Sequence, residues 1–392
     1  MSVLQAQDPG DIIARTQLDT RFAPFYHGVA SGDPLPDGVI IWTRVTPSDS
    51  GTAAVNWKIA TATAFSTLAN SGTVLTDANQ DYTVKVDVTG LQPGTWYYYQ
   101  FEQDGRKSII GRTFTAPTSN VDSLRFGVVS CSKYSNGYFN VYGRMAQRND
   151  LHAILHLGDY IYEDGASSTR PHDPNFEVVD LDDYRLRHSQ YKMDADLQCL
   201  HQMYPFITVW DDHESANNSW RDGADAHQPA SEGLWIDRKA SAIQAYYEWM
   251  PIRQTDLQNR ERIYRKLSYG NLLDFFMLDT RLIGRDEQTS GSGSDDTTRS
   301  LLGPTQLARR SAEMKASTAQ WKMLGQQVMM APLEVFGTPV NPDQWDGYRP
   351  ERQRLYDTIT THNIENVVVL TGDIHTYWAN DLPGDNYDPH TG

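Results

Sequence analysis

The sequence contains only two cysteines, Cys131 and Cys199, which form at most one disulfide, so no disulfide framework is expected to hold the fold. No apolar run reaches the roughly 18–20 residues of a membrane-spanning helix. The first residues, "MSVLQAQDPGDIIARTQLD", lack a basic segment followed by an apolar one, so no signal peptide is predicted within this chain. These absences argue against a disulfide-stapled domain and an integral membrane protein.

Basic residues are also scarce, with 34 Lys and Arg against 50 Asp and Glu and a formal net charge of -16 at pH 7. A general nucleic-acid binder needs a basic surface, which this composition does not provide. The acidic excess is compatible with a secreted protein or with one that binds cations. With 39% hydrophobic residues over 392 positions, the chain is predicted to be globular and has room for two or more domains.

The first part of the chain has the pattern of an all-β domain that follows an N-terminal arm, residues 1–24. Short stretches rich in β-branched and aromatic residues alternate with turn residues across 25–116, which predicts an antiparallel β-sandwich. "LQPGTWYYYQF" is typical of the entry to a late strand in immunoglobulin-like and fibronectin-III-like domains. The expected strands lie within 38–45, 53–62, 82–90, 95–105 and 107–117.

From residue 122 to residue 392 the pattern changes to alternating strands and helices. The strand candidate 124–129, the helix candidate 138–149 and the strand candidate 152–159 form a β-α-β unit, which is usually a parallel pair with a right-handed crossover. This alternation predicts an α/β sandwich. Further strands are expected within 205–212, 272–281, 322–332 and 366–375, and further helices within 231–250 and 305–321.

Polar residues follow each of these strands. In open α/β sheets, ligands bind outside the carboxyl ends of the strands. A strand-end Asp often only caps the next helix, and a cysteine there is often a buried apolar side chain. Carboxylates gathered from separate strands repel one another unless cations or protons offset the charge, so metal binding is the favoured explanation. The residues are Cys131, Gly158–Glu163, Asp211–Glu214, Asp279, Arg281 and Gly372–His375.

The ligand types limit the metals. A Cys131 thiolate with a Tyr162 phenolate favours a highly charged ion such as Fe³⁺, and carboxylates with amide oxygens suit Ca²⁺ or Mn²⁺ beside it. His375 adds a nitrogen ligand, and Asp159 is the candidate bridge between two ions. A zinc site of Cys and His alone is disfavoured because no clustered Cys or His spacing is present. Two adjacent ions that polarise phosphoryl oxygens indicate a phosphoester hydrolase.

Six motifs occur in order along the chain, namely "HGVASGDPLPDGVIIWTRV" (27–45), "HLGDYIYEDG", "VWDDHESANN", "LDTR", "QWDGY" and "LTGDIH". Together they resemble the PhoD-like alkaline phosphatase/phosphodiesterase family. This resemblance implies a metallophosphoesterase-like catalytic domain, with two central sheets flanked by helices, after a β-sandwich. It also implies Fe³⁺ with Ca²⁺ as cofactors and export to the periplasm or outside by the twin-arginine route.

The resemblance also implies roles for individual residues. Cys131, Asp159, Tyr162 and His375 would face iron, with Asp159 bridging, whereas Asp212, Asn217 and Asp373 would face calcium. His213 is the predicted acid that protonates the leaving alkoxide during attack by metal-activated hydroxide. Arg281 is the predicted contact to a phosphoryl oxygen, with a structural pairing to Asp279 as the alternative.

Three functions remain open at this point. The first is a secreted or periplasmic phosphomonoesterase or phosphodiesterase, and the second is a phospholipase D-type phosphodiesterase with the same metals. The third is a cation-stabilised adhesion or scaffold protein, which needs neither iron nor His213. The family continues well beyond "NYDPHTG", so the catalytic domain is expected to be truncated at its C-terminus or completed by a separate C-terminal fragment of the same protein.

Overall fold

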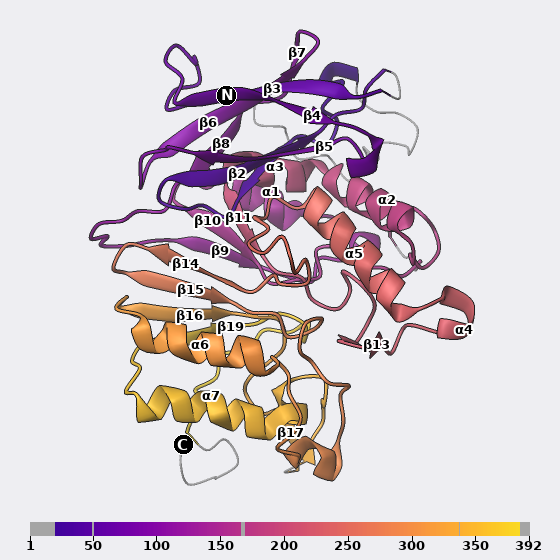
Figure 1. The fold of residues 1–392 in the computed structure, drawn as a ribbon, viewed down its shortest axis with the longest axis vertical. Coiled ribbons are helices and arrows are strands. Elements are labelled where there is room, and N and C mark those ends of the chain that lie inside the picture. Colours follow the sequence, from indigo (N-terminus) through magenta and orange to yellow (C-terminus); the bar gives the residue numbers. More distant parts are fainter. Residues whose placement is uncertain (1–19, 49–50, 166–168, 337, 385–392) are drawn as a thin grey trace.

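The chain forms stacked layers of sheet and helix, seen from top to bottom in Figure 1. The structure is a computed structural model that describes residues 20–48, 51–165, 169–336 and 338–384. Its layers are an N-terminal five-stranded sheet, a six-stranded sheet, a four-stranded sheet and a final pair of helices. The α/β fold with an N-terminal β region is therefore confirmed.

The six-stranded sheet joins both halves of the sequence. Its strand order is β5-β2-β1-β11-β10-β9. The first three strands are antiparallel to one another, whereas β1 pairs with β11 in parallel, and so do β11 with β10 and β10 with β9. The strands are β1 (Val29–Gly32), β2 (Gly38–Arg44), β5 (Thr83–Thr89), β9 (Phe126–Val129), β10 (Ala153–His156) and β11 (Pro205–Thr208).

A separate antiparallel sheet packs over β5, β2 and β1 of that sheet and completes a β-sandwich. The apolar side chains of both sheets, such as Val39, Ile41, Val55 and Tyr99, are buried together in one core. Because β1 continues into the parallel sheet, the sandwich shares a sheet with the rest of the chain. Its strands are β3 (Ala53–Ala60), β4 (Asn70–Thr76), β6 (Trp96–Gln103), β7 (Arg106–Lys107) and β8 (Gly111–Phe114).

The four-stranded sheet packs face to face against the six-stranded one. Phe126 of β9 contacts Phe275 of β15 edge-on, with ring centroids 4.8 Å apart. The opposite face of this sheet is covered by α6 and α7, which contribute Met314 and Leu355 to a second core. Its strands are β14 (Arg265–Tyr269), β15 (Leu273–Met277), β16 (Trp321–Gly325) and β19 (Val367–Leu370), and all pairs except β14–β15 are parallel.

The helices and the short elements complete the two sides of this sheet pair. Those packed near the six-stranded sheet are α1 (Asn140–Ala146), α2 (Leu181–Lys192), α3 (Ala195–Met203) and α5 (Trp235–Trp249). The remaining ones are α4 (Pro229–Glu232), α6 (Pro304–Ala316), α7 (Arg349–Thr361) and the hairpins β12 (Ser219–Trp220) with β13 (Gly223–Ala224) and β17 (Glu334–Val335) with β18 (Thr338–Pro339).

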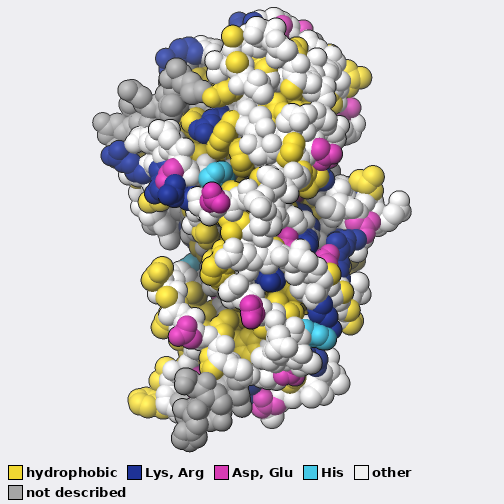
Figure 2. Space-filling view, turned by 90° about the vertical axis from the view of Figure 1, so that its left-hand side faces the viewer, with side chains coloured by type: hydrophobic (Ala, Val, Ile, Leu, Met, Phe, Trp, Pro, Cys, Tyr) yellow, Lys and Arg dark blue, Asp and Glu magenta, His cyan; other side chains and the backbone are white. Residues whose placement is uncertain are grey.

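The surface agrees with the charge balance of the sequence. On the face shown in Figure 2, Lys and Arg side chains are interspersed with Asp and Glu and do not gather into one extended basic patch. Within the described residues, no helix combines the length and the apolarity needed to cross a bilayer. The domain boundaries 1–24, 25–116 and 122–392 and the immunoglobulin-like and metallophosphoesterase-like assignments stay predictions.

Candidate metal centre

The ends of β9, β10, β11 and β19 open into one cleft of about 1320 Å³. Cys131, Tyr162, His213 and His375 all line it, so residues more than 240 positions apart meet at one edge of the sheets. The same cleft continues along an apolar wall formed by Val128, Val129 and residues 367–370. The structure therefore brings together these four residues predicted from the strand ends.

The local backbone at this edge is unusual. Cys131, Asp159, Asp373 and His375 all adopt left-handed conformations, with φ of 57°, 54°, 63° and 55°. Non-glycine residues rarely do so, and such positions cluster at functional sites. Gly158 precedes Asp159 because a Cβ there would lie 2.6 Å from the backbone nitrogen of Asp211. The glycine lets the ends of two neighbouring strands approach closely.

On one side of the site, Cys131, Asp159 and His375 place their ligand atoms within 4.8 Å of one another. The Tyr162 hydroxyl lies 3.1 Å from Asp159 Oδ2 and 3.3 Å from His375 Nε2. Asp159 Oδ1 is buried and has no hydrogen-bond partner among the described residues. A buried carboxylate oxygen that lacks a partner is costly unless a cation occupies that position.

The pKa values of these residues also depend on a cation. Burial, with the carboxylate of Asp159 adding to it, raises the pKa of the Cys131 thiol and of the Tyr162 phenol far above their usual values. Both groups are therefore protonated when no metal is bound, and a bound ion would release their protons as it binds. The donor set fits a metal ion, because a bound ion would convert the thiol and the phenol into anionic ligands, a thiolate and a phenolate.

On the other side, Asp211, Asp212 and Asp373 form a second group within 4.8 Å, and Asp159, Asp212 and His213 form a third. Burial raises the pKa of Asp373 to about 7, although Arg281 opposes the shift. At Asp212 burial also acts upward, but Arg281 and His213 outweigh it and lower the pKa to about 2. Asp159 belongs to two of these groups, which is the position that a bridging ligand needs.

Arg281 does not reach the cleft as a free substrate contact. Its side chain is fully buried, and its guanidinium lies 2.5 Å from Asp211, 2.8 Å from Asp343 and 2.7 Å from Asp373. The alternative, a pairing with Asp279, is also altered, because Asp279 accepts a hydrogen bond from the Arg281 backbone nitrogen at 2.7 Å. The guanidinium instead neutralises three other carboxylates.

His213 is held by a second carboxylate. Its Nδ1 lies 2.5 Å from Glu163 Oε2, and its ring stacks against Tyr162 with centroids 4.3 Å apart. Burial would lower the pKa of His213, but Glu163, Asp212 and Asp159 outweigh it and raise this pKa well above its usual value. A protonated imidazole at the cleft can donate a proton. The same ring also lies within reach of Asp159 and Asp212, as a metal ligand would.

Asn217 is placed less directly. Its backbone nitrogen donates to Glu163 Oε1 at 2.7 Å, and the next residue, Asn218, donates its backbone nitrogen to Asp212 Oδ2 at 2.6 Å. The loop that carries Asn217 is thus attached to the site. The contact of the Asn217 side chain with an ion stays a prediction.

Sequence reasoning did not assign roles to four buried carboxylates at the site, namely Asp211, Glu163, Glu214 and Asp343. Asp211 and Glu214 flank two assigned residues, so their spacing was visible, but nothing in the sequence marks their hydrogen-bond partners. Burial raises the pKa of Glu214 to about 8, with Asp159 adding to the shift. Cys199, by contrast, is 2% exposed within the main core, as expected of a buried cysteine.

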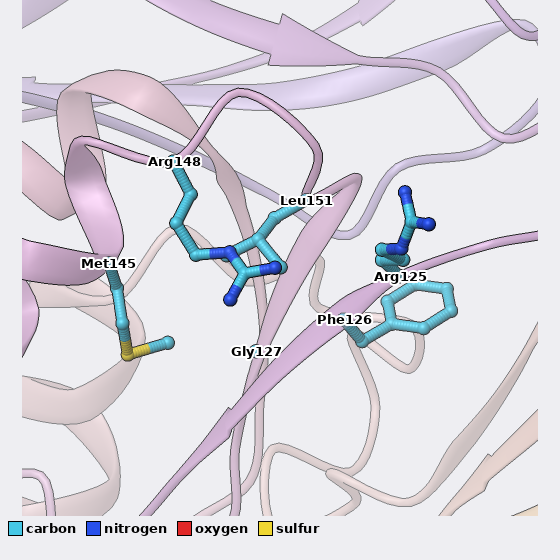
Figure 3. A pocket seen from close by; sticks show the side chains of 6 residues that line it. All are labelled: Arg125, Phe126, Gly127, Met145, Arg148 and Leu151. Atoms are coloured by element: carbon cyan, nitrogen blue, oxygen red, sulfur yellow. The ribbon is translucent and has the colours of Figure 1, made fainter.

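A smaller pocket of about 280 Å³ lies at the opposite end of β9 (Figure 3). Its lining includes Gly127, Met145 and Leu151. Arg148 extends toward Leu151, whereas the guanidinium of Arg125 points away from these residues. Arg148 already forms two hydrogen bonds to Asp150, at 2.8 and 2.7 Å, so the pocket offers little free positive charge. The cleft at the carboxyl ends of the strands is the better candidate for chemistry.

Comparisons with known proteins agree with this choice. A family model described as PhoD-like phosphatase matches residues 126–392, and one for the N-terminal domain of such phosphatases matches residues 12–117. The chain is 39% identical over 388 residues to alkaline phosphatase D of Bacillus subtilis (strain 168). This match covers 92% of this chain and 66% of that protein. A solved structure of PhoD superposes with a TM-score of 0.88 at 37% identity, covering 94% of this chain and 75% of that one. The chain thus spans slightly less than two thirds of the B. subtilis protein.

Proposed function

The chain belongs to the PhoD-like phosphatase family, and from this membership we propose that it hydrolyses phosphate mono- or diesters with bound metal ions. The observation that carries the proposal is the convergence of Cys131, Asp159, Tyr162 and His375, in which Tyr162 and His375 approach Asp159 Oδ2 while the buried Asp159 Oδ1 lacks a partner among the described residues. Such a set has little use in a purely structural protein, because a thiol, a phenol, an imidazole and a carboxylate gathered at one point offer the S, O and N ligands that a metal ion binds.

We propose Fe³⁺ on the side of Cys131, Tyr162 and His375 and Ca²⁺ on the side of Asp212, Asn217 and Asp373, with Asp159 shared. Thiolate and phenolate suit a trivalent ion, whereas carboxylate and amide oxygens suit calcium. When bound, such ions polarise a phosphoryl group and lower the pKa of a water molecule. The residues of the chain then orient the ester and deliver protons.

His213 is the proposed proton donor to the leaving oxygen. The carboxylate of Glu163 holds Nδ1 and keeps the imidazole protonated, so the opposite nitrogen, Nε2, is the atom left to face the cleft. Arg281 takes a different proposed role from the one predicted. Because it contacts Asp211, Asp343 and Asp373, we assign it to holding these carboxylates in place.

The test is a hydrolysis assay on the purified chain after reconstitution with Fe³⁺ and Ca²⁺. Simple monoesters, simple diesters and phosphatidylcholine are compared at equal concentration. Turnover of simple esters supports a phosphatase or phosphodiesterase, and turnover confined to phosphatidylcholine supports a phospholipase D. Absence of turnover on all three, with metals bound, would leave only the scaffold alternative.

The location of the protein is a separate proposal. Its acidic composition and its family favour a secreted or periplasmic protein that meets its ester outside the cytoplasm. Fractionation of cells that express the full-length natural protein tests this. Recovery of the protein and its phosphatase activity in the cytoplasmic fraction alone would contradict it.

A further inference from the structure

Glu214 is buried beside the metal centre, against the backbone of the loops that carry Asp159 and Asp212. It is 2% exposed and is absent from the residues that line the cleft. Its Oε2 accepts hydrogen bonds from the backbone nitrogens of Asp159, at 2.9 Å, and Asp211, at 2.6 Å. Its Oε1 accepts a hydrogen bond from the backbone nitrogen of Tyr160. One buried carboxylate therefore satisfies three backbone amides.

These three amides belong to two different strand ends. The ladder between β10 and β11 ends at the pair His156 and Thr208, and one further bond joins the Val209 nitrogen to the His156 oxygen at 3.1 Å. Beyond that point the two strands end in the loops that carry Asp159 and Asp212. Glu214 Oε2 bridges the two loops where the ladder between β10 and β11 no longer does.

The consequence concerns the distance between the two shared carboxylates. Asp159 and Asp212 both belong to the group that can hold one ion, and their side chains leave the backbone within one residue of amides bound by Glu214. Partners behind a metal ligand typically change metal affinity about 10- to 100-fold when they are removed.

We infer that Glu214 is a positioning residue that sets the spacing of Asp159 and Asp212 and thereby the affinity of the site for its ions. The inference rests on the proposed function, because it assumes that these two carboxylates bind metal. Glu214 itself contacts neither ion nor substrate.

Two substitutions separate the bridge from the charge. Glu214→Met keeps the volume but removes all three acceptors, so both loops lose their common anchor. Glu214→Gln retains one oxygen, which can still accept from the Asp159 and Asp211 amides, but its amino group then faces the Tyr160 amide as a second donor. The glutamine is therefore expected to weaken binding less than the methionine does, but by more than twofold, because the Tyr160 amide loses its acceptor.

Glu351 offers a matched control, because it neither lines the cleft nor belongs to a group that could hold a metal ion. It is fully buried and accepts hydrogen bonds from the backbone nitrogens of Leu301, at 2.6 Å, and Leu302, at 3.2 Å. Glu351→Met removes a similar carboxylate from a similar set of amides. It is expected to lower the thermal midpoint without changing metal binding.

The experiment is calorimetric titration of Ca²⁺ into chelator-treated parent and variant chains, with thermal midpoints and iron content of the untreated chains measured in parallel. The expected result is about 10- to 100-fold weaker Ca²⁺ binding for Glu214→Met, a smaller loss for Glu214→Gln and none for Glu351→Met. Parent-like affinity in Glu214→Met overturns the inference, as does an equal loss in both methionine variants. If Glu214→Met does not fold, Glu214→Gln decides, and affinity within twofold of the parent overturns the inference. A parent chain that binds no Ca²⁺ and hydrolyses no ester instead refutes the proposed function.

Discussion

Replacing Arg281 by Met tests whether this arginine organises the site or contacts the substrate. The side chain is fully buried and pairs with three carboxylates at 2.5 to 2.8 Å. A fourth carboxylate, that of Asp212, lies 3.6 Å from the guanidinium. Removing one partner from a buried ion pair typically costs about 3–5 kcal/mol, because the remaining charge stays buried. Here several carboxylates lose their cation at once, so the loss in the metal-free protein is expected at the upper end of that range.

Bound cations change this expectation in a measurable way. Ions between Asp212 and Asp373 offset part of the negative charge that Arg281 otherwise neutralises, so the metal-loaded variant should lose less stability than the metal-free one. The assay is urea unfolding of parent and Arg281→Met, each with bound metal and after chelator treatment. The free energy of unfolding of Arg281→Lys should fall between those of the parent and Arg281→Met, because one ammonium group replaces a planar fork of five donors.

Arg310→Met is the control for this measurement. Arg310 is also fully buried, but it forms an ion pair of 2.8 Å with Glu313, and neither residue lines the cleft. Its loss should be smaller and independent of metal. If Arg281→Met unfolds like the parent and only raises KM for the ester, the guanidinium reaches the substrate and the structural role is wrong.

Two other predictions follow from the titrating groups of the site. Folding raises the pKa of Asp373 from its ordinary value of about 3.9 to about 7, so between these values the folded chain binds a proton that the unfolded chain has lost. The free energy of unfolding of the chelator-treated protein should therefore fall as pH rises from 4 to 7. Urea unfolding at pH 5 and pH 8 measures this, and greater stability at pH 8 would contradict it. Replacing His213 by Ala should reduce kcat by about 10²–10⁴-fold and leave the metal content unchanged; loss of iron from this variant would make His213 a ligand instead of an acid.

Much of the fold follows from local sequence patterns. The expected strands at 124–129, 152–159 and 366–375 contain β9, β10 and β19, and the helix expected at 305–321 overlaps α6. The strands β10 and β19 end before their expected ranges do, because left-handed backbone follows them at Asp159, Asp373 and His375. Apolar runs mark a strand, but they do not mark where it bends away from the sheet.

Other features have no local signal. The parallel pairing of β1 with β11 joins residues about 170 positions apart, so the sequence predicted a separate sandwich where the structure has a shared sheet. The strands β1, β4 and β14 and the helices α2 and α7 were not predicted, since their apolar faces are short or interrupted by charged residues. Tertiary packing defines these elements.

The same contrast holds at the site. Residues after strands were predictable because parallel strands end at one edge, which brought Cys131, Asp159 and His375 together as expected. The pairing of Arg281 with Asp343 was not predictable, because the loop that carries Asp343 does not directly follow a strand of the six- or four-stranded sheet. Roles that depend on backbone amides, such as that of Glu214, leave no trace in residue type.

The most direct test of the metal centre is metal analysis of the purified chain together with its visible spectrum, for the parent and for Tyr162→Phe. A phenolate bound to Fe³⁺ produces a charge-transfer band, so the parent should contain iron and calcium and be coloured. The Tyr162→Phe chain should lose that band while it remains folded. A colourless parent that is active with zinc alone, or a band that survives in Tyr162→Phe, would contradict the assignment.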